Sequence, residues 1–395
     1  MKRLSNIFEK ICTEDNFKLA LYNAIKNKGH YKEVIKIMED PDFYIHKYLE
    51  DVSSETYVTS PYKVFNLYSG HKWRTIYKLP MKDRIIQHAI MNIMEPWFRQ
   101  HFIVDTYSSI KGRGIHRGLY RVKRALKNNH NLKYCLKFDI RKFYPSIDKE
   151  ILKHMLVNDI KDKKLLSLLF KIIDSCESGV PIGNYTSQYF ANYYLTDLDI
   201  YVKQELDCKY YFRYCDDIVI LASSKESLHH IFNKIKSKVA SLKLNIKYNY
   251  QIFPIELRGI DFLGYVIRRK YVRVRKKTKQ AFVKSCNKHK DKSISSYFGI
   301  LKHCDGRNLW KKSVLCDVPY ITLKKYSSRK IRNKIIKITH IYSYIKSGKQ
   351  TIKVSTDRGE FLSQSIHLIN SLKGVKIPIE GIINKNYKFI DNESL

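Results

Sequence analysis

The spacing of hydrophobic and polar positions changes several times along the chain and predicts a mixture of helices and strands. Up to about residue 60, apolar residues recur at helical spacing in a polar background, as in 17–26 and 31–38. Between 136 and 265, strand-like runs alternate with helical periodicity. The strand-like runs are 134–138, 209–214 and 218–222, and the helical ones are 151–155 and 228–242. This alternation predicts an α+β fold.

The C-terminal third has a different pattern. It starts extended at 271–275 and then turns helical, and residues 335–395 return to short strands with Gly348 and Gly359 as turn signals. We therefore expect a helical segment followed by a small β-rich part.

Composition narrows the class of protein. The 395 residues are 44% hydrophobic, which excludes a disordered chain. No apolar run approaches the roughly 18–20 residues that cross a bilayer, and the first residues lack the apolar core of a secretory signal. The sequence predicts a cytoplasmic protein without a membrane partner.

The charge indicates a polyanionic partner. Lys and Arg total 74 against 37 Asp and Glu, so the formal net charge is +37. Residues 268–350 hold 25 Lys or Arg and only three acids, a local excess of 22. Lysine abundance in an AT-rich genome would not deplete acids locally, and the interleaved Tyr and Phe offer faces on which bases stack. We therefore favour a nucleic acid.

Three carboxylates end strand-like runs. Asp216 and Asp217 separate two such runs, which predicts a hairpin with both at its tip. Aspartate is also a common turn residue, so the pair alone is weak evidence. The run 133–139, however, also stops at an aspartate, Asp139. Acids crowded together favour a divalent cation such as Mg²⁺, which binds oxygen ligands and leaves positions open for phosphates.

These stretches resemble the motifs of a reverse transcriptase. Tyr214-Cys215-Asp216-Asp217 is similar to the family's Y-x-D-D loop, and Phe138 to Tyr144 resembles its first catalytic motif. The segment 179–188 resembles the family's template- and nucleotide-contacting motif, with Ile182 and Gln188 in place of the Gln and Pro of retroviral members. In this respect the chain resembles the polymerases of diversity-generating retroelements and the defence-associated (antiphage) bacterial reverse transcriptases. Further motifs follow in the family's order at 74–89, 105–118, 242–247 and 262–265.

The resemblance implies roles for individual residues. Asp139, Asp216 and Asp217 would be catalytic and would ligate two Mg²⁺ ions, with Mn²⁺ as an alternative, and Lys247 would protonate the leaving pyrophosphate. Tyr144 would exclude ribonucleotides as a steric gate. The remaining nucleotide-binding candidates are Arg74, Lys82, Arg84, Gly183 and Gln188. The primer and template candidates are Phe262, Leu263 and Gly264. Asn184 fits as the N-cap of a helix that begins after it.

The resemblance also implies a right-hand polymerase with fingers, an antiparallel palm sheet and a helical thumb. We assign 1–60 to an N-terminal helical extension, 61–135 to the fingers, 136–260 to the palm, 261–320 to the thumb and 321–395 to a basic, β-rich C-terminal appendage.

The expected activity is RNA-directed DNA synthesis from an RNA template, such as a dedicated noncoding RNA, in antiphage defence or retroelement diversification. The partners would be this RNA, the DNA product strand, dNTPs, and either an accessory protein or a second copy of the chain. Two alternatives stay open: an untemplated or repeat-synthesising DNA polymerase, and a catalytically silent RNA-binding scaffold.

Overall fold

A computed structural model describes residues 3–69, 72–288 and 290–313, together with the strands 336–346, 349–356, 359–363, 379–383 and 389–391. The chain divides into two compact units, Met1–Leu263 and Gly264–Leu395, which are described separately. In the part of the chain covered by these ranges, no helix is both long and apolar enough to cross a membrane.

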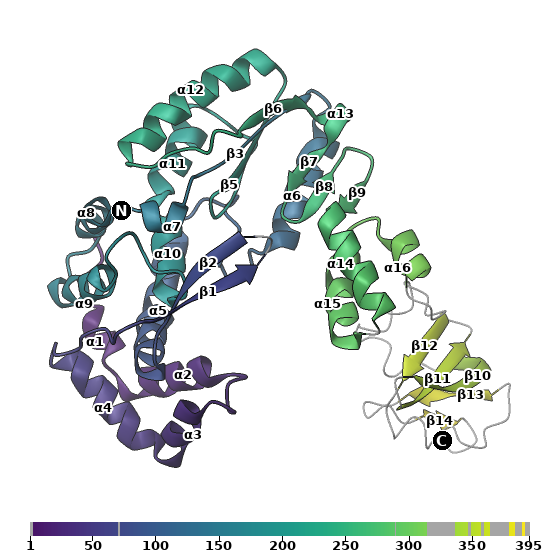
Figure 1. The fold of residues 1–395 in the computed structure, drawn as a ribbon, viewed down its shortest axis with the longest axis horizontal. Helices are drawn as coiled ribbons and strands as arrows, with labels where there is room; N and C mark the ends of the chain where they lie inside the picture. The colour runs from purple at the N-terminus through teal and green to yellow at the C-terminus, as the bar shows by residue number, and fades with distance from the viewer. Residues whose placement is uncertain are drawn as a thin grey trace. The chain divides into compact units, whose positions relative to one another are not determined.

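Two of the N-terminal helices of the first unit, α2 (Glu14–Ile25) and α4 (Pro41–Ser53), begin after residues whose side chains cap them. The Thr13 side chain accepts a hydrogen bond from the Asn16 backbone at the start of α2, and Asp40 does the same for Phe43 at the start of α4. These helices pack against the long helix α5 (Figure 1). The bounds are α1 (Phe8–Ile11), α2 (Glu14–Ile25), α3 (Lys32–Glu39), α4 (Pro41–Ser53) and α5 (Met81–His101). The predicted N-terminal helices are confirmed.

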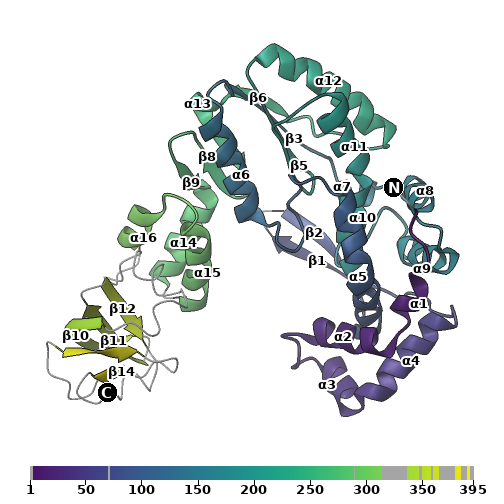
Figure 2. The ribbon, with the colours of Figure 1, turned by 180° about the vertical axis from the view of Figure 1, so that it is seen from behind.

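A four-stranded antiparallel sheet forms the centre of the first unit. Its strand order is β4-β5-β3-β6, with β4 (Tyr211–Tyr214), β5 (Asp217–Ala222), β3 (Tyr134–Asp139) and β6 (Gln251–Pro254). Helix α12 (Lys225–Ser241) contacts β3, β5 and β6 and covers one face (Figures 1 and 2). The antiparallel sheet expected for a polymerase palm is present.

The first unit contains further helices and strands. They are β1 (Lys63–Ser69), β2 (Lys72–Lys78), α6 (Ile115–Asn128), α7 (Phe143–Ser146), α8 (Lys149–Asp159), α9 (Lys163–Asp174), α10 (Tyr185–Tyr194), α11 (Thr196–Ile200), a π-helical turn (Tyr201–Glu205), α13 (Ile255–Arg258) and β7 (Ile260–Phe262). Strands β1 and β2 form a hairpin whose base is held by a hydrogen bond from the Tyr77 amide to the Ile182 carbonyl (2.9 Å).

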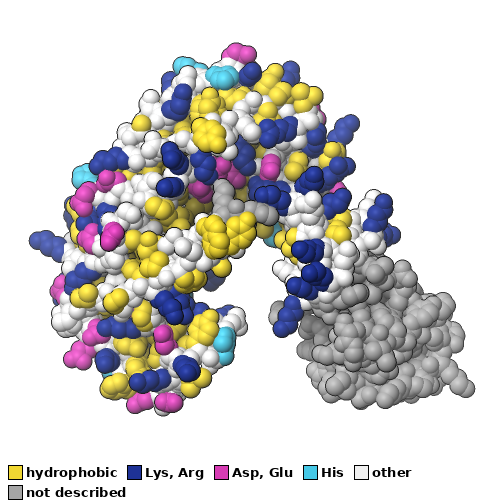
Figure 3. Space-filling view, in the orientation of Figure 1, with side chains coloured by type: hydrophobic (Ala, Val, Ile, Leu, Met, Phe, Trp, Pro, Cys, Tyr) yellow, Lys and Arg dark blue, Asp and Glu magenta, His cyan; other side chains and the backbone are white. Residues whose placement is uncertain are grey.

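The second unit combines helices with strands. The hairpin β8 (Tyr265–Ile267) and β9 (Val272–Val274) precedes α14 (Lys276–Asn287), α15 (Asp291–Leu301) and α16 (Arg307–Ser313). Phe282, Cys286, Leu301 and Trp310 form their core. The outer surface of α14 is basic and has no acid (Figure 3).

A five-stranded antiparallel sheet lies nearer the C-terminus. Its order is β12-β11-β10-β13-β14, with β10 (Ile336–Lys346), β11 (Lys349–Thr356), β12 (Gly359–Ser363), β13 (Ile379–Ile383) and β14 (Phe389–Asp391). The expected β-rich C-terminal part is thus confirmed. The five-part division of the chain into fingers, palm, thumb and flanking parts stays a prediction.

Candidate active site

The three aspartates come together at one end of the palm sheet. Asp139 is the last residue of β3 and lies directly opposite Asp217, the first residue of β5. Asp216 precedes β5, and its carbonyl accepts a hydrogen bond from the Ile140 amide (3.3 Å). Residues opposite each other in an antiparallel pair point to the same face. The register therefore places the Asp139 and Asp217 carboxylates side by side.

The turn that carries Asp216 is strained. Tyr214 pairs with Asp217, so Cys215 and Asp216 form a two-residue hairpin loop. Cys215 has a φ of 56°, a left-handed conformation at the first central position, which is typical of a type II′ turn and favours glycine. The surrounding contacts must stabilise this conformation, since Cys215 itself does not.

Lys247 lies between two of the carboxylates. Its Nζ is 3.6 Å from Oδ1 of Asp139 and 4.0 Å from Oδ2 of Asp216. Its backbone amide donates to the Asp139 carbonyl (2.8 Å), which fixes it beside the end of β3. Burial and the nearby Asp139 raise the pKa of Asp216, and Lys247 opposes them only in part. A cation at this point is therefore favourable.

Lys137 holds the third carboxylate. Its Nζ lies 3.3 Å from Oδ1 of Asp217 and also donates to the Asp261 carbonyl. Our sequence analysis missed this residue. The signal was present, because Lys137 precedes Asp139 by two positions on β3 and so points to the same face.

The donors fit a hard divalent cation. Within the described residues, no three His, Cys, Asp or Glu side chains are already arranged to hold a metal ion. Carboxylate oxygens are nevertheless the ligands that Mg²⁺ prefers. Asp139 and Asp216 both face the Lys247 ammonium, so two negative charges already converge on a single cation. Asp217, paired with Lys137, is suited to a supporting role.

Tyr144 lies beside the Cys215–Asp216 turn. Its hydroxyl is 3.8 Å from Sγ of Cys215, and burial raises the pKa of the phenol above its ordinary value. The Tyr144 carbonyl accepts from the Val180 amide (3.0 Å). A Cβ on Gly179 would come within 2.1 Å of that same carbonyl oxygen. Glycine at 179 thus permits the 179–184 segment to approach Tyr144.

The nucleotide-binding candidates fall into separate places. Arg84, Gly183 and Gln188 line one pocket of about 170 Å³, together with Lys28 and His88. Burial lowers the pKa of His88 to about 4, and the charges of Lys28 and Arg84 add to this effect. The pocket therefore carries positive charge while His88 is neutral.

The other two candidates lie elsewhere. Arg74 is exposed on β2. Lys82 forms an ion pair with Asp51 of the N-terminal helices, with Nζ 2.7 Å from Oδ2. Of the five nucleotide-binding candidates other than Tyr144, the structure thus brings three together and leaves these two apart from them.

One expectation about helix α10 needs correction. Asn184 occupies the N-cap position, but its side chain does not cap the helix and donates instead to the Tyr62 hydroxyl (2.8 Å). Oε1 of Gln87 accepts from the amides of Tyr185 (2.9 Å) and Thr186 (3.5 Å). The cap is supplied by another helix because Gln87 on α5 packs against the start of α10.

The primer and template candidates have distinct environments. Phe262 is fully buried and Leu263 nearly so. Leu263 and Gly264 have φ values of 56° and 87°, two successive left-handed residues as in a type I′ turn. A Cβ on Gly264 would meet nothing within 4 Å, so backbone conformation rather than space favours glycine there.

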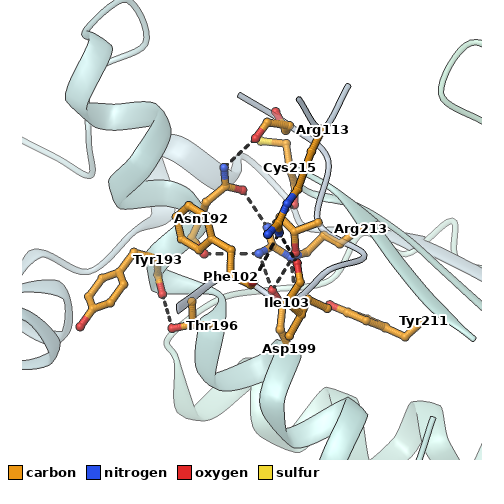
Figure 4. Close-up of polar contacts among 12 residues, drawn as sticks. Phe102, Ile103, Arg113, Asn192, Tyr193, Thr196, Asp199, Tyr211, Arg213 and Cys215 are labelled. Carbon is orange, nitrogen blue, oxygen red and sulfur yellow. Dashed lines mark hydrogen bonds and ion pairs between the residues drawn. The ribbon is translucent and has the colours of Figure 1, made fainter. Parts of the chain in front are cut away.

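A buried ionic network contacts the Cys215–Asp216 turn, and our sequence analysis missed it (Figure 4). Arg213 and Asp199 are both fully buried. Nε and Nη2 of Arg213 donate to the two oxygens of Asp199 (2.7 and 2.5 Å), and Nη1 donates to the Cys215 carbonyl (3.2 Å). Asn192 accepts two further bonds from the guanidinium (3.1 and 3.3 Å). The network therefore anchors the strained turn to α10 and α11.

This arrangement is that of a right-hand polymerase palm. Residues 69–267 match the family described as reverse transcriptase (RNA-dependent DNA polymerase), which is half of the chain. The chain belongs to this family, and the resemblance drawn from its motifs is confirmed.

Curated relatives agree with this assignment. The chain is similar to Retron Ec73 reverse transcriptase of Escherichia coli, 29% identical over 195 residues, or 46% of this chain and 60% of that protein. It is 23% identical to Protein YkfC of E. coli strain K12 over 247 residues (51% and 65%). It is 24% identical to the group II intron-encoded protein LtrA of Lactococcus lactis subsp. cremoris over 215 residues (51% and 35%). The matched part spans less than two thirds of each of these relatives.

Among solved structures, the chain is similar to apo telomerase from Candida tropicalis. The TM-score is 0.45 at 12% identity, covering 56% of this chain and 49% of that one.

Proposed function

We propose that this protein synthesises DNA on an RNA template by phosphoryl transfer at the Asp139–Asp216–Asp217 site. The observation that carries the proposal is the convergence of Asp139 and Asp216 on Lys247, at the end of an antiparallel sheet in a reverse transcriptase domain. A scaffold without chemistry would not need a strained turn with crowded acids.

Asp139 and Asp216 would hold two Mg²⁺ ions, or Mn²⁺, with Asp217 in support. When bound, such ions activate an attacking 3′-oxygen and stabilise the leaving pyrophosphate. Lys137 keeps Asp217 oriented along the strand end. Lys247 would give up a proton from Nζ to the leaving pyrophosphate, and its position within 4.0 Å of Asp139 and Asp216 supports this role.

Other residues would select and position the substrates. Tyr144 beside the turn would exclude the 2′-hydroxyl of a ribonucleotide. Arg74, Lys82, Arg84, Gly183 and Gln188 would bind the incoming dNTP and its template base. Phe262, Leu263 and Gly264 would support the primer. The pocket shared by Arg84, Gly183 and Gln188 supports this grouping for three of them.

The template we favour is a dedicated noncoding RNA. The excess of 22 positive charges in residues 268–350 supports extensive phosphate contact. We further propose a cytoplasmic role in antiphage defence or retroelement diversification, supported by the similarity to Retron Ec73 reverse transcriptase. An accessory protein or a second copy of the chain would complete the assembly.

The test is to purify the protein with its bound RNA, add Mg²⁺ and four dNTPs, and sequence the product. We expect DNA complementary to that RNA, lost when EDTA is added. The double variant Asp216→Asn/Asp217→Asn should bind RNA but make no DNA, whereas the exposed control Asp15→Asn should behave as wild type. Noncomplementary repeats would overturn templated synthesis, and bound RNA without product would favour a scaffold.

A further inference from the structure

Helix α3 has an apolar side that the rest of the fold covers only in part. Five apolar residues three or four positions apart share one side of the helix: Tyr31, Val34, Ile35, Ile37 and Met38. Val34 and Ile37 are buried and belong to the core. Tyr31, Ile35 and Met38 are 40%, 51% and 49% exposed, and we call these three residues the α3 ridge. An apolar helix face left at the surface is suited to packing against another helix.

The α3 ridge is held in a fixed position by contacts at both ends of the helix. Oε2 of Glu33 accepts a hydrogen bond from the amide of Met81 (2.9 Å), which is the first residue of α5. Nζ of Lys78 lies 5.4 Å from the centroid of the Tyr31 ring. At the other end, the Asp40 side chain caps the following helix, α4. A partner would therefore bind a surface that is already ordered, which lowers the entropic cost of association.

The charge of the N-terminal helices does not suit a nucleic acid. Residues 1–60 hold nine Lys or Arg and ten Asp or Glu, a formal charge of −1, whereas residues 61–395 hold 65 and 27, a formal charge of +38. A polyanion binds by contacts with Lys and Arg, and an anionic lipid surface attracts the same residues. The α3 ridge lies in the one part of the chain that lacks this excess of positive charge, so a protein partner fits it better.

Acids next to the α3 ridge indicate the kind of protein that would bind. Residues 39–55 contain six Asp or Glu and a single Lys. Glu39 directly follows Met38, and both Glu39 and Asp42 are exposed. Figure 3 shows hydrophobic and acidic side chains close together over this end of the first unit. A helix with apolar residues along one side and Lys or Arg beside them complements both features. A two-fold dimer through this face would instead bring the same acids together.

We propose that the α3 ridge is the docking site for a partner protein that presents a basic amphipathic helix. This specifies the accessory protein that the proposed function includes, but the docking itself does not depend on DNA synthesis. Glu33 joins α3 to the first residue of α5, and α5 carries Arg84 and Gln87 of the candidate site. The partner would therefore bind beside a helix that lines the nucleotide-binding pocket.

The test uses the full chain and a labelled synthetic helical peptide with Leu on one side and Lys on the other, followed by anisotropy without dNTPs. Ile35→Ser and Met38→Ser should each weaken binding about fivefold, because about half of each side chain is still open to burial. The double variant should lose about 25-fold if the two effects add. Leu257→Ser removes a large side chain that is 79% exposed on α13 and should leave the Kd unchanged. The Tm of all variants should equal that of wild type.

A second peptide tests the charge of the partner. A peptide with Glu in place of each Lys should bind at least about tenfold more weakly, since it brings like charges together. The double variant Glu39→Gln/Asp42→Asn should weaken binding of the Lys peptide about threefold, as expected for exposed ion pairs. It should also make the Kd less sensitive to salt, which screens such pairs. Asp40 is kept because its side chain caps α4.

Each other outcome overturns a stated part of the proposal. Equal binding of the Lys peptide to wild type and to Ile35→Ser/Met38→Ser would place the docking site elsewhere. Equal affinity for the two peptides would exclude a basic partner. If the double variant abolishes self-association in sedimentation velocity, the face belongs to a second copy, and if it weakens binding of a labelled RNA, the face belongs to a nucleic acid. Peptide binding that persists in a protein without DNA synthesis would contradict the proposed function alone.

Discussion

The buried pair of Asp199 and Arg213 allows a quantitative prediction. Asp199→Asn removes the negative charge but keeps the size of the side chain. One oxygen remains to accept from Arg213 Nε (2.7 Å) and from the Tyr211 hydroxyl (2.6 Å). The other becomes an amide that faces the Nη2 donor, now 2.5 Å from Oδ2. A buried guanidinium is then left without its counter-charge.

The expected cost follows from this geometry. Burial acts to lower the pKa of Arg213, and in the wild type the Asp199 carboxylate more than offsets this effect. The variant lacks that carboxylate, but a guanidinium is effectively always protonated in proteins, so Arg213 stays charged and loses its counter-charge. Removing one partner of a buried ion pair costs about 3–5 kcal/mol. Because native stability is only about 5–15 kcal/mol, urea unfolding of the full chain should show a large loss in the free energy of unfolding.

The double variant Arg213→Met/Asp199→Leu provides the control. Removing both charges should cost much less than the sum of the single substitutions. It should not restore DNA synthesis, since the bond to the Cys215 carbonyl is still missing. An Asp199→Asn cost below about 1 kcal/mol, or strict additivity of the two substitutions, would refute a tightly coupled buried pair.

Three further predictions concern the site. Gly183→Ala should destabilise the protein by about 2 kcal/mol or more, because φ is +132° and the new Cβ would lie 2.3 Å from the Tyr77 carbonyl oxygen. Gly112→Ala, with a positive φ of +77° but open space around the new Cβ, should cost only about 1 kcal/mol in urea unfolding. Asp216→Asn should raise the Tm of the metal-free protein by about 2 °C at pH 7, since burial raises the pKa of this carboxyl. The wild-type protein is destabilised by Asp216 only at pH values where this carboxyl is ionised in the folded state. The Tm values of wild type and variant should therefore converge as the pH falls through the raised pKa of Asp216. Equal Tm values at pH 7 would contradict the reasoning. Tyr144→Ala should raise ribonucleotide incorporation relative to dNTPs by about tenfold, as for a removed clash of about 1.4 kcal/mol, and an unchanged ratio in single-nucleotide extension would remove the steric gate.

The sequence pattern correctly predicted those strands and helices whose formation depends on residues close together along the chain. The strand runs that end at Asp139 and begin at Asp217 are confirmed as β3 and β5, and their pairing brings the acids together. Asp148 caps α8 by accepting from the Ile151 amide (3.0 Å), a contact three residues away. Such hydrogen bonds can be predicted from the sequence because the donor and the acceptor are close along the chain.

Contacts between distant segments were not predictable in the same way. Gln87 caps α10 from 98 residues away, in place of Asn184. The alternation of β3 indicated the direction of Lys137, but its pairing with Asp217 required the register with β5. The sequence indicated only that Arg213 belongs to the strand before the Y-x-D-D loop. Its buried partner Asp199 lies 14 residues earlier in the chain, and no local pattern predicts that they pair.

The sequence by itself thus determined the family, the antiparallel palm and the three carboxylates, since these follow from short-range periodicity and from motifs a few residues long. Only the tertiary structure decided which cations hold those carboxylates, what supports the strained turn at Cys215, and which pocket Arg84 and Gln188 share. The physical reason is that a buried charge must find its partner in space, and in this fold the partner comes from another element: Asp199 for Arg213, and Asp217 for Lys137.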